Sequence, residues 1–205
     1  MENSQGQDSE QATAILKQVQ TNYESCVSYS DDVTGRPNAV GDQFVIEINL
    51  LRTKGIRVML KYSLFGKAEN AVVWGSGSSY SLYMSDPGGA ETRPLGNALT
   101  TLDPLGEFLV SIVPRLLMPE GFKSGSYFTE IHDARIDGVS DVRGRSCNIV
   151  SFLSKRSTAR TKFFVDQADF SIRRIETEKA TLDLHPKFGA PVTDNDVSFK
   201  PARGG

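Results

Sequence analysis

Four side chains that could bind a metal ion lie close together in one segment: Glu130, His132, Asp133 and Asp137. Carboxylates and imidazoles are common metal ligands. On an extended strand successive side chains point to opposite faces, so Glu130 and His132 would share one face and the two aspartates the other. At most two ligands would converge, and the chain has only one further histidine, His185. The pattern favours a solvated polar edge over a metal centre.

Two other motifs suggest chemistry, and both have a simpler structural interpretation. The segment Gly75–Ser79 is rich in glycine and serine, as phosphate-binding loops are, but such a loop must lead into a helix whose free N–H groups face the anion. The residues that follow, 80–83, alternate like a strand, so a hairpin turn is predicted. Nucleophilic catalysis needs a base beside the nucleophile, and the chain has two histidines and no Gly-x-Ser-x-Gly elbow. We therefore predict neither an enzyme nor a cofactor.

The two cysteines, Cys26 and Cys147, leave two alternatives open. Both could be buried thiols that pack as small apolar side chains. Alternatively, one disulfide would close a loop of roughly 120 residues and add about 3–5 kcal/mol of stability, which would fit an exported protein.

Composition limits the class of protein. A chain of 205 residues with 39% hydrophobic and 23% charged residues is expected to form one globular domain with a sizeable core. Its net charge of −2 provides no basic surface for nucleic acid.

The polar N-terminus, residues 1–10, lacks the features of a signal peptide. Either a cytosolic protein or an exported protein after cleavage of its signal would fit, and we expect residues 1–8 to be disordered.

Alternating hydrophobic residues predict a meander of antiparallel strands. Residues 44–51 and 56–65 alternate with a period of two across a short link that contains Gly55, which indicates a hairpin with one buried face. Residues 25–34 precede them as a first strand. Further strands are predicted at 68–74, 79–85, 126–136, 145–153, 159–166, 170–184 and 197–200, the long 170–184 strand with a bulge near Arg173 and Arg174.

Helices are predicted at 9–24, 95–102 and 104–118. The first begins with Asp8 or Ser9 as its N-cap and has one apolar stripe. The last has Asp103 as N-cap and Pro104 at its first position. It is apolar around most of its circumference, so it must be buried or contact a ligand. Pro114 should kink or end it.

Several short motifs resemble those of the LolA/LolB-like lipoprotein carrier superfamily, and in particular a branch of predicted periplasmic proteins. They are Tyr23-Glu24-Ser25-Cys26-Val27-Ser28-Tyr29-Ser30-Asp31, Ala71-Val72-Val73-Trp74-Gly75, Val142-Arg143-Gly144-Arg145-Ser146-Cys147, Phe163-Phe164-Val165-Asp166, Ile172-Arg173-Arg174-Ile175 and Val197-Ser198-Phe199-Lys200-Pro201. Their order and spacing, rather than any single motif, carry the resemblance, which runs from the first helix to Pro201.

The resemblance implies an α+β fold, mainly antiparallel, in which an unclosed and strongly curved half-barrel is covered on its concave side by helices. It also implies an exported, periplasmic protein, with or without a lipid anchor, that shelters acyl chains of lipids or lipoproteins. The alternative is a sensor of envelope stress that binds an apolar ligand or misfolded polypeptide and signals to a protein partner. No ligand residue of the known carriers transfers to this chain by motif.

The residues themselves suggest a lining for such a cavity, although any buried core would show the same pattern. The predicted lining is Phe44, Ile46, Ile48, Val58, Leu60 and Tyr62 from the sheet and Phe108, Leu109, Ile112 and Leu116 from the covering helix. Leu64 and Phe65 stand at a predicted hairpin tip, where they would contact a membrane or a membrane-bound partner. Their replacement with serine would then weaken binding to liposomes.

Overall fold

The chain folds around one antiparallel sheet that does not close into a barrel. The computed structural model describes residues 2–39, 42–64, 67–85, 89–102, 109–155 and 158–201; of residues 2–7, 64, 89 and 90 it describes the backbone alone. The strands follow the order β6-β5-β4-β3-β2-β1-β11-β10-β9-β8-β7, and β12 pairs with β1. The strands are β1 (Ser28–Pro37), β2 (Phe44–Leu51), β3 (Gly55–Leu64), β4 (Lys67–Ser76), β5 (Ser79–Met84), β6 (Gly89–Arg93), β7 (Ile131–Val142), β8 (Arg145–Ser154), β9 (Arg160–Asp166), β10 (Ile172–Glu176), β11 (Ala180–Asp183) and β12 (Lys187–Phe188).

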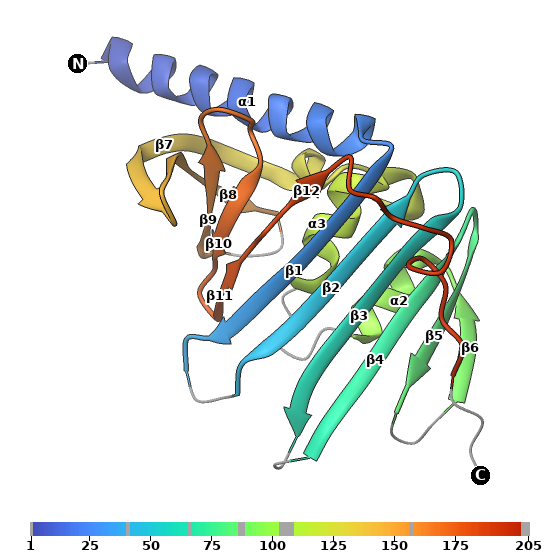
Figure 1. Cartoon of the computed structure of the whole chain (residues 1–205). Coiled ribbons are helices and arrows are strands. Elements are labelled where there is room, and N and C mark those ends of the chain that lie inside the picture. Colours follow the sequence, from blue (N-terminus) through green and yellow to red (C-terminus); the bar gives the residue numbers. More distant parts are fainter. Residues whose placement is uncertain are drawn as a thin grey trace.

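Helices cover one face and one end of this sheet (Figure 1). They are α1 (Glu2–Ser25), α2 (Leu95–Thr101) and α3 (Leu109–Leu117), with two 3-10 turns, η1 (Pro119–Gly121) and η2 (Tyr127–Glu130). The helix α1 lies across one end of the strands, whereas α2 and α3 lie against the concave face (Figure 1). The antiparallel sheet is not closed and helices cover its concave face, which confirms the predicted half-barrel.

The hairpin of β2 and β3 lies inside the sheet, between β1 and β4. Along β2 every second residue is buried, and Ile46 and Ile48 lie opposite Leu60 and Val58 of β3. At the start of β3, Gly55 has a φ of +136°, and a Cβ there would lie 2.1 Å from the carbonyl oxygen of Gly75 on β4. Only glycine permits this approach, which explains its position in the predicted link.

The apolar stripe of α1 is buried as predicted, but the helix is longer than expected. Ala12, Ile15, Leu16, Val19 and Tyr23 all lie in the core. The helix begins at Glu2, so the N-cap predicted at Asp8 or Ser9 is wrong. Its first turns project beyond the sheet (Figure 1). Packing of the later turns anchors a helix whose polar beginning carries no apolar signal of its own.

Every residue of α3 is buried, as the apolar sequence requires. Pro114 lies inside the helix, which ends three residues later at Leu117, and the carbonyl of Pro114 accepts a hydrogen bond from the N–H of Met118 at 2.8 Å. Residues 103–108, which include the predicted N-cap and Phe108, lie outside the described residues.

The structure differs from the predicted strands at several places. Residues 126–130 form the turn η2 rather than a strand, because the Ser126 side chain accepts from the N–H of Phe128 and caps the turn. The predicted strand 170–184 is two strands, β10 and β11, separated by a turn in which Thr177 N–H bonds to Ala180 O. The register between β9 and β10 shifts between Ile172 and Arg174, which confirms the expected bulge. Residues 89–93 and 187–188 form strands that were not predicted.

Residues 190–201 cross the outer face of the sheet instead of forming the predicted strand at 197–200 (Figure 1). Phe199 packs against Trp74 of β4 and Tyr83 of β5, with ring centroids 5.1 and 5.4 Å away. Val197, two residues before Phe199, is also buried. Side-chain packing rather than ladder hydrogen bonds therefore holds this segment.

Both cysteines are free thiols, so the disulfide alternative is not what the structure contains. The Cys26 thiol donates to the carbonyl of Tyr23 at the end of α1. Cys147 lies in a separate small apolar cluster with Val142 and Phe164. Burial raises the pKa of both thiols, that of Cys147 to about 11.

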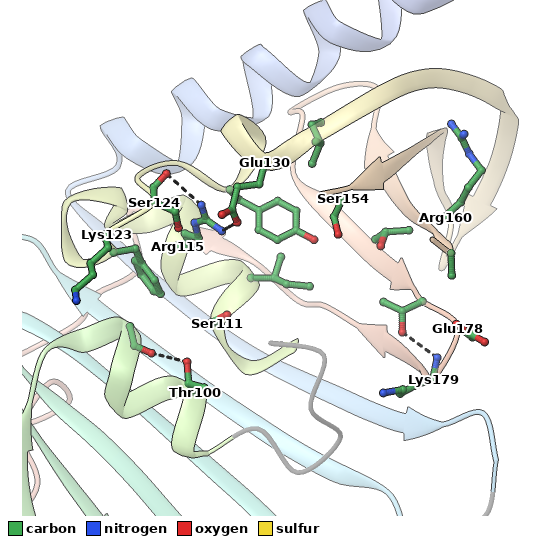
Figure 2. Close-up of a pocket in the computed structure, with 18 of the residues that line it drawn as sticks. Thr100, Ser111, Arg115, Lys123, Ser124, Glu130, Ser154, Arg160, Glu178 and Lys179 are labelled. Carbon is green, nitrogen blue, oxygen red and sulfur yellow. Dashed lines mark hydrogen bonds and ion pairs between the residues drawn. The ribbon is translucent and has the colours of Figure 1, made fainter. Parts of the chain in front are cut away.

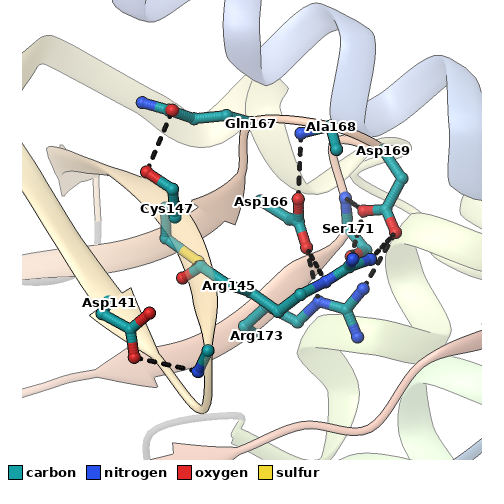
Figure 3. Close-up of polar contacts among 11 residues, drawn as sticks. Asp141, Arg145, Cys147, Asp166, Gln167, Ala168, Asp169, Ser171 and Arg173 are labelled. Atoms are coloured by element: carbon teal, nitrogen blue, oxygen red, sulfur yellow. Dashed lines mark hydrogen bonds and ion pairs between the residues drawn. The ribbon is translucent and has the colours of Figure 1, made fainter.

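A network of ion pairs beside Cys147 closes the turn between β9 and β10 (Figure 3). The carboxylate of Asp166 accepts from Arg145 at 2.8 Å and from Arg173 at 3.1 Å. Asp169 accepts from the same two guanidinium groups at 3.1 and 2.8 Å. Each charge thus has two partners, which fixes the end of the sheet on which α1 rests.

Candidate functional site

A hollow of about 600 Å³ lies between the helices and the far half of the sheet (Figure 2). Its walls come from α2, α3, the loop that leads into β7, the ends of β8 and β9, and the turn between β10 and β11. We call it the inner hollow. It is lined by Gly96, Asn97, Thr100, Ser111, Ile112, Arg115, Phe122, Lys123, Ser124, Tyr127, Glu130, Ile131, Ser154, Thr158, Ala159, Arg160, Thr161, Thr177, Glu178 and Lys179.

The inner hollow has an apolar side formed by Ile112, Phe122, Tyr127 and Ile131. The Tyr127 ring stacks on Phe163 of β9 at a centroid distance of 5.8 Å, so this wall rests directly on the core. Pockets of about 300–1,000 Å³ with apolar walls and a few polar groups are the usual binding sites for small molecules. The size and one side of the hollow therefore suit an apolar group.

Arg115 of α3 holds the loop that forms this wall. Its guanidinium donates to the carbonyls of Gly125 at 2.7 Å and Ser126 at 3.0 Å, and to that of Ser124 at 3.3 Å. It also pairs with the Glu130 carboxylate at 2.6 Å (Figure 2). Only 8% of the Arg115 side chain is exposed. These bonds use four of the five N–H donors of Arg115, so its main role is to position the wall.

The exposed positive charges of the inner hollow lie at its rim. Lys123 and Lys179 are exposed at the edge of the hollow, and Arg160 lies across from Lys123 (Figure 2). Arg160 is neutralised by an ion pair with Asp133 at 2.5 Å. Apart from Arg160 and the pair of Arg115 with Glu130, the charged side chains of the lining are two lysines, Lys123 and Lys179, and one acid, Glu178, so the rim is weakly positive.

Most of the predicted lining lies in the packed core instead. Phe44, Ile46, Ile48, Val58 and Leu60 are each at most 4% exposed, because α2 and α3 pack directly on the concave face. Leu109 and Leu116 are buried in the same cluster, and Tyr62 packs against it. Of the predicted lining residues whose side chains the structure describes, Ile112 alone borders the inner hollow. Phe108 and Phe65 lie outside the described residues, and of Leu64 only the backbone is described.

The residues considered as metal ligands do not converge. Glu130 pairs with Arg115, Asp133 with Arg160, and Asp137 with Arg135. Over the ranges that the structure describes, no three metal-ligating side chains gather at one point. The glycine-serine segment is the predicted hairpin turn, since Ser76 pairs with Ser79 across it.

Sequence reasoning missed the loop 122–131 and the turns at 158–161 and 177–179, which provide much of the wall. Their residues are far apart in the chain and polar or mixed, so no periodicity marks them. A usable signal was present only in Ser126, a helix-capping residue type in front of aromatic residues.

Comparison with known proteins gives fold-level similarity only. No family model and no curated protein sequence matches the chain. Among solved structures, MucB is 15% identical with a TM-score of 0.56 over 94% of this chain and 64% of its own. The MucA/MucB complex of Pseudomonas aeruginosa is 13% identical with a TM-score of 0.52, over 93% of this chain and 61% of its own. The lipoprotein LppX of Mycobacterium tuberculosis is 10% identical with a TM-score of 0.50, over 90% of this chain and 98% of its own. The chain has a LolA-like fold. It spans less than two thirds of the length of the MucB chain. No helix among the described residues is long and apolar enough to cross a membrane.

Proposed function

We propose that this protein is a non-enzymatic, periplasmic binding protein that holds an acyl chain of a lipid or lipoprotein in the inner hollow. The observation that carries the proposal is a hollow of about 600 Å³ with an apolar wall and exposed lysines at its rim, placed under the helices of a half-barrel. An amphiphile with an anionic head group matches both features. The LolA-like fold shared with a lipoprotein supports an exported location.

The apolar wall is large enough to provide a useful driving force. Burial of about six methylene groups at about 0.8 kcal/mol each would contribute about 5 kcal/mol before the cost of immobilising the ligand. The exposed lysines would add little in salt, since exposed charges are screened by solvent. Affinity would therefore depend mainly on the chain.

The lining of the inner hollow favours binding over chemistry on the ligand. The lining contains two acids: the Glu130 carboxylate pairs with Arg115, and the Glu178 side chain is exposed. Among the side chains that line the hollow there is no histidine or cysteine. The pattern fits recognition of a ligand rather than its conversion.

A pair of adjacent threonines on α2 allows a matched test. Thr100 lines the inner hollow, whereas its neighbour Thr101 does not, and each hydroxyl donates to the carbonyl four residues earlier. We expect Thr100→Phe to fill part of the hollow and Thr101→Phe to leave it open. Native mass spectrometry with lysophosphatidylglycerol should show bound lipid on the wild type and equally on Thr101→Phe, and weaker binding or one bound molecule fewer on Thr100→Phe. Equal binding by all three proteins, or by none, would refute the proposal.

The complex of MucA with MucB favours a second candidate function, that of a regulator that binds a protein partner. In this case the ligand in the hollow would control partner binding instead of being carried. Transfer of lipid between donor and acceptor vesicles separates the two: a carrier raises the transfer rate, and a regulator leaves it unchanged while its partner affinity responds to lipid.

A further inference from the structure

A second hollow of about 420 Å³ lies on the other side of the loop that walls the first. We call it the outer hollow. It runs between α1 and the beginning of β7, which is an edge strand of the sheet. It is lined by Ser9, Thr13, Leu16, Lys17, Gln20, Ser126, Phe128, Thr129, Ile131, His132, Asp133 and Ala134.

The outer hollow has an apolar floor and a polar rim. Leu16 and Ala134 form buried parts of the floor, and Phe128 and Ile131 are packed against the core beside them. The exposed side chain of Lys17 stands at the rim. The negative charge of Asp133 is balanced by Arg160, which lines the inner hollow. The outer hollow therefore repeats the chemistry of the inner one on a smaller scale.

One short segment separates the two hollows. Along residues 126–131, Tyr127 and Glu130 face the inner hollow, Phe128 and Thr129 face the outer one, and Ile131 borders both. The ring centroids of Tyr127 and Phe128 are 5.8 Å apart, so the wall is about two side chains thick.

This wall is held from both sides. Arg115 of α3 binds the carbonyls of residues 124–126 from the inner side. From the outer side, the Ser126 hydroxyl donates to the Gln20 side chain of α1 at 2.5 Å. A wall with these anchors divides the space into two fixed compartments instead of acting as a gate.

We propose that the outer hollow takes the second acyl chain of an anionic diacyl phospholipid whose first chain occupies the inner hollow. The inference rests on the proposed function. Two apolar compartments meet at Ile131, and the ion pair between Arg160 and Asp133 joins their rims. A ligand with two chains and one anionic head fits this arrangement.

The local backbone disfavours a peptide as the occupant. A peptide that added to the edge of the sheet would need a regular strand, and the register of β7 shifts between His132 and Arg135. Asp133 has a φ of +51°, which interrupts the alternation at the hollow itself. Such irregularities blunt edge strands against pairing.

The two threonines Thr13 and Thr21 of α1 provide a matched pair for the test. Both are exposed, and both hydroxyls donate to the carbonyl four residues earlier, at 2.9 and 3.0 Å. Only Thr13 lines the outer hollow. Thr13→Phe should therefore fill this hollow, while Thr21→Phe is the control for a bulky residue on the same helix.

The experiment is native mass spectrometry of the full chain with lysophosphatidylglycerol, which has one chain, and with phosphatidylglycerol, which has two. We expect up to two lyso molecules but one diacyl molecule on the wild type and on Thr21→Phe. Thr13→Phe should hold one lyso molecule and bind the diacyl lipid more weakly. Loss of contact with only two methylene groups would weaken binding about tenfold.

The outcomes separate this inference from the proposed function. If the wild type never holds more than one lyso molecule, or if Thr13→Phe binds both lipids like Thr21→Phe, the outer hollow is not a chain site and the inner site stands. If neither lipid binds the wild type, the proposed function fails and the inference fails with it. Circular dichroism of each variant establishes that it is folded before binding is compared.

Discussion

Asp31 is a buried carboxyl group whose ionisation should set part of the pH dependence of stability. It lies on β1 and is 1% exposed. One carboxylate oxygen accepts from the Tyr29 hydroxyl at 2.6 Å, and the other accepts from the backbone N–H of His185 at 2.7 Å. Burial raises the pKa of Asp31 to about 6, although both hydrogen bonds act to lower it.

The size and sign of the effect follow from this pKa. The carboxyl of an unfolded aspartate has a pKa of about 3.9, so the folded state binds the proton more tightly by about two pKa units, or about 3 kcal/mol. Because the folded state holds more protons between these two values, the free energy of unfolding decreases as the pH rises from about 4 to about 6. Above this window the contribution of Asp31 stays at its lower level.

The variant Asp31→Asn isolates this contribution. Its amide keeps an oxygen for the His185 N–H and places a donor beside the Tyr29 hydroxyl, which can accept. Urea unfolding of both proteins should show the variant gaining about 3 kcal/mol relative to the wild type between about pH 4 and about pH 7. Other titrating groups cancel in this difference. A difference that stays constant over this range would refute the reasoning.

Asp183 provides a control of opposite sign. Burial alone would raise the pKa of its carboxyl group, but hydrogen bonds from Arg174 and Arg36 hold the pKa below its usual value. The wild type should therefore be more stable than Asp183→Asn at neutral pH and lose this advantage only below about pH 4.

Three further predictions concern the core and the outer face. Arg115→Met should lower the free energy of unfolding by about 3 kcal/mol in urea titrations, because it leaves a largely buried carboxylate without its cation. Phe199→Ala should expose Trp74, the single tryptophan, and shift its fluorescence to longer wavelength, whereas an unchanged spectrum would mean that the C-terminal segment does not cover it. The buried Cys147 should react with a thiol reagent only after unfolding, and both cysteines should react in the unfolded protein without prior reduction, whereas a need for reductant would show a disulfide.

The strands and helices that were predictable are those whose burial follows a simple period. The alternation along residues 44–51 and the apolar stripe of α1 each result from one buried face, so the local sequence is enough to predict them. The turn at 126–130 was missed because its conformation depends on a capping serine and on Arg115, which contacts it from another helix. Long-range contacts of this kind leave no local pattern.

The candidate site was not predictable for a related reason. The predicted lining was the most regular apolar face in the chain, formed by residues such as Ile46 and Val58, and a regular apolar face is what helices cover most completely. The space left over lies where packing is irregular, at the loop around Tyr127 and at the turns near Arg160 and Lys179. Periodicity identifies the core, and a hollow forms where periodicity ends.

The distribution of charge around the inner hollow also limits what kind of selectivity it can have. Arg115, the most buried cation, uses its donors on backbone carbonyls and Glu130. The head group of a ligand would therefore meet Lys123 and Lys179, which are exposed and whose attraction is screened by salt. Contacts with the apolar wall are not screened, and each methylene group lost there changes the affinity several-fold. The protein should thus discriminate between chains by number and length more strongly than between anionic head groups.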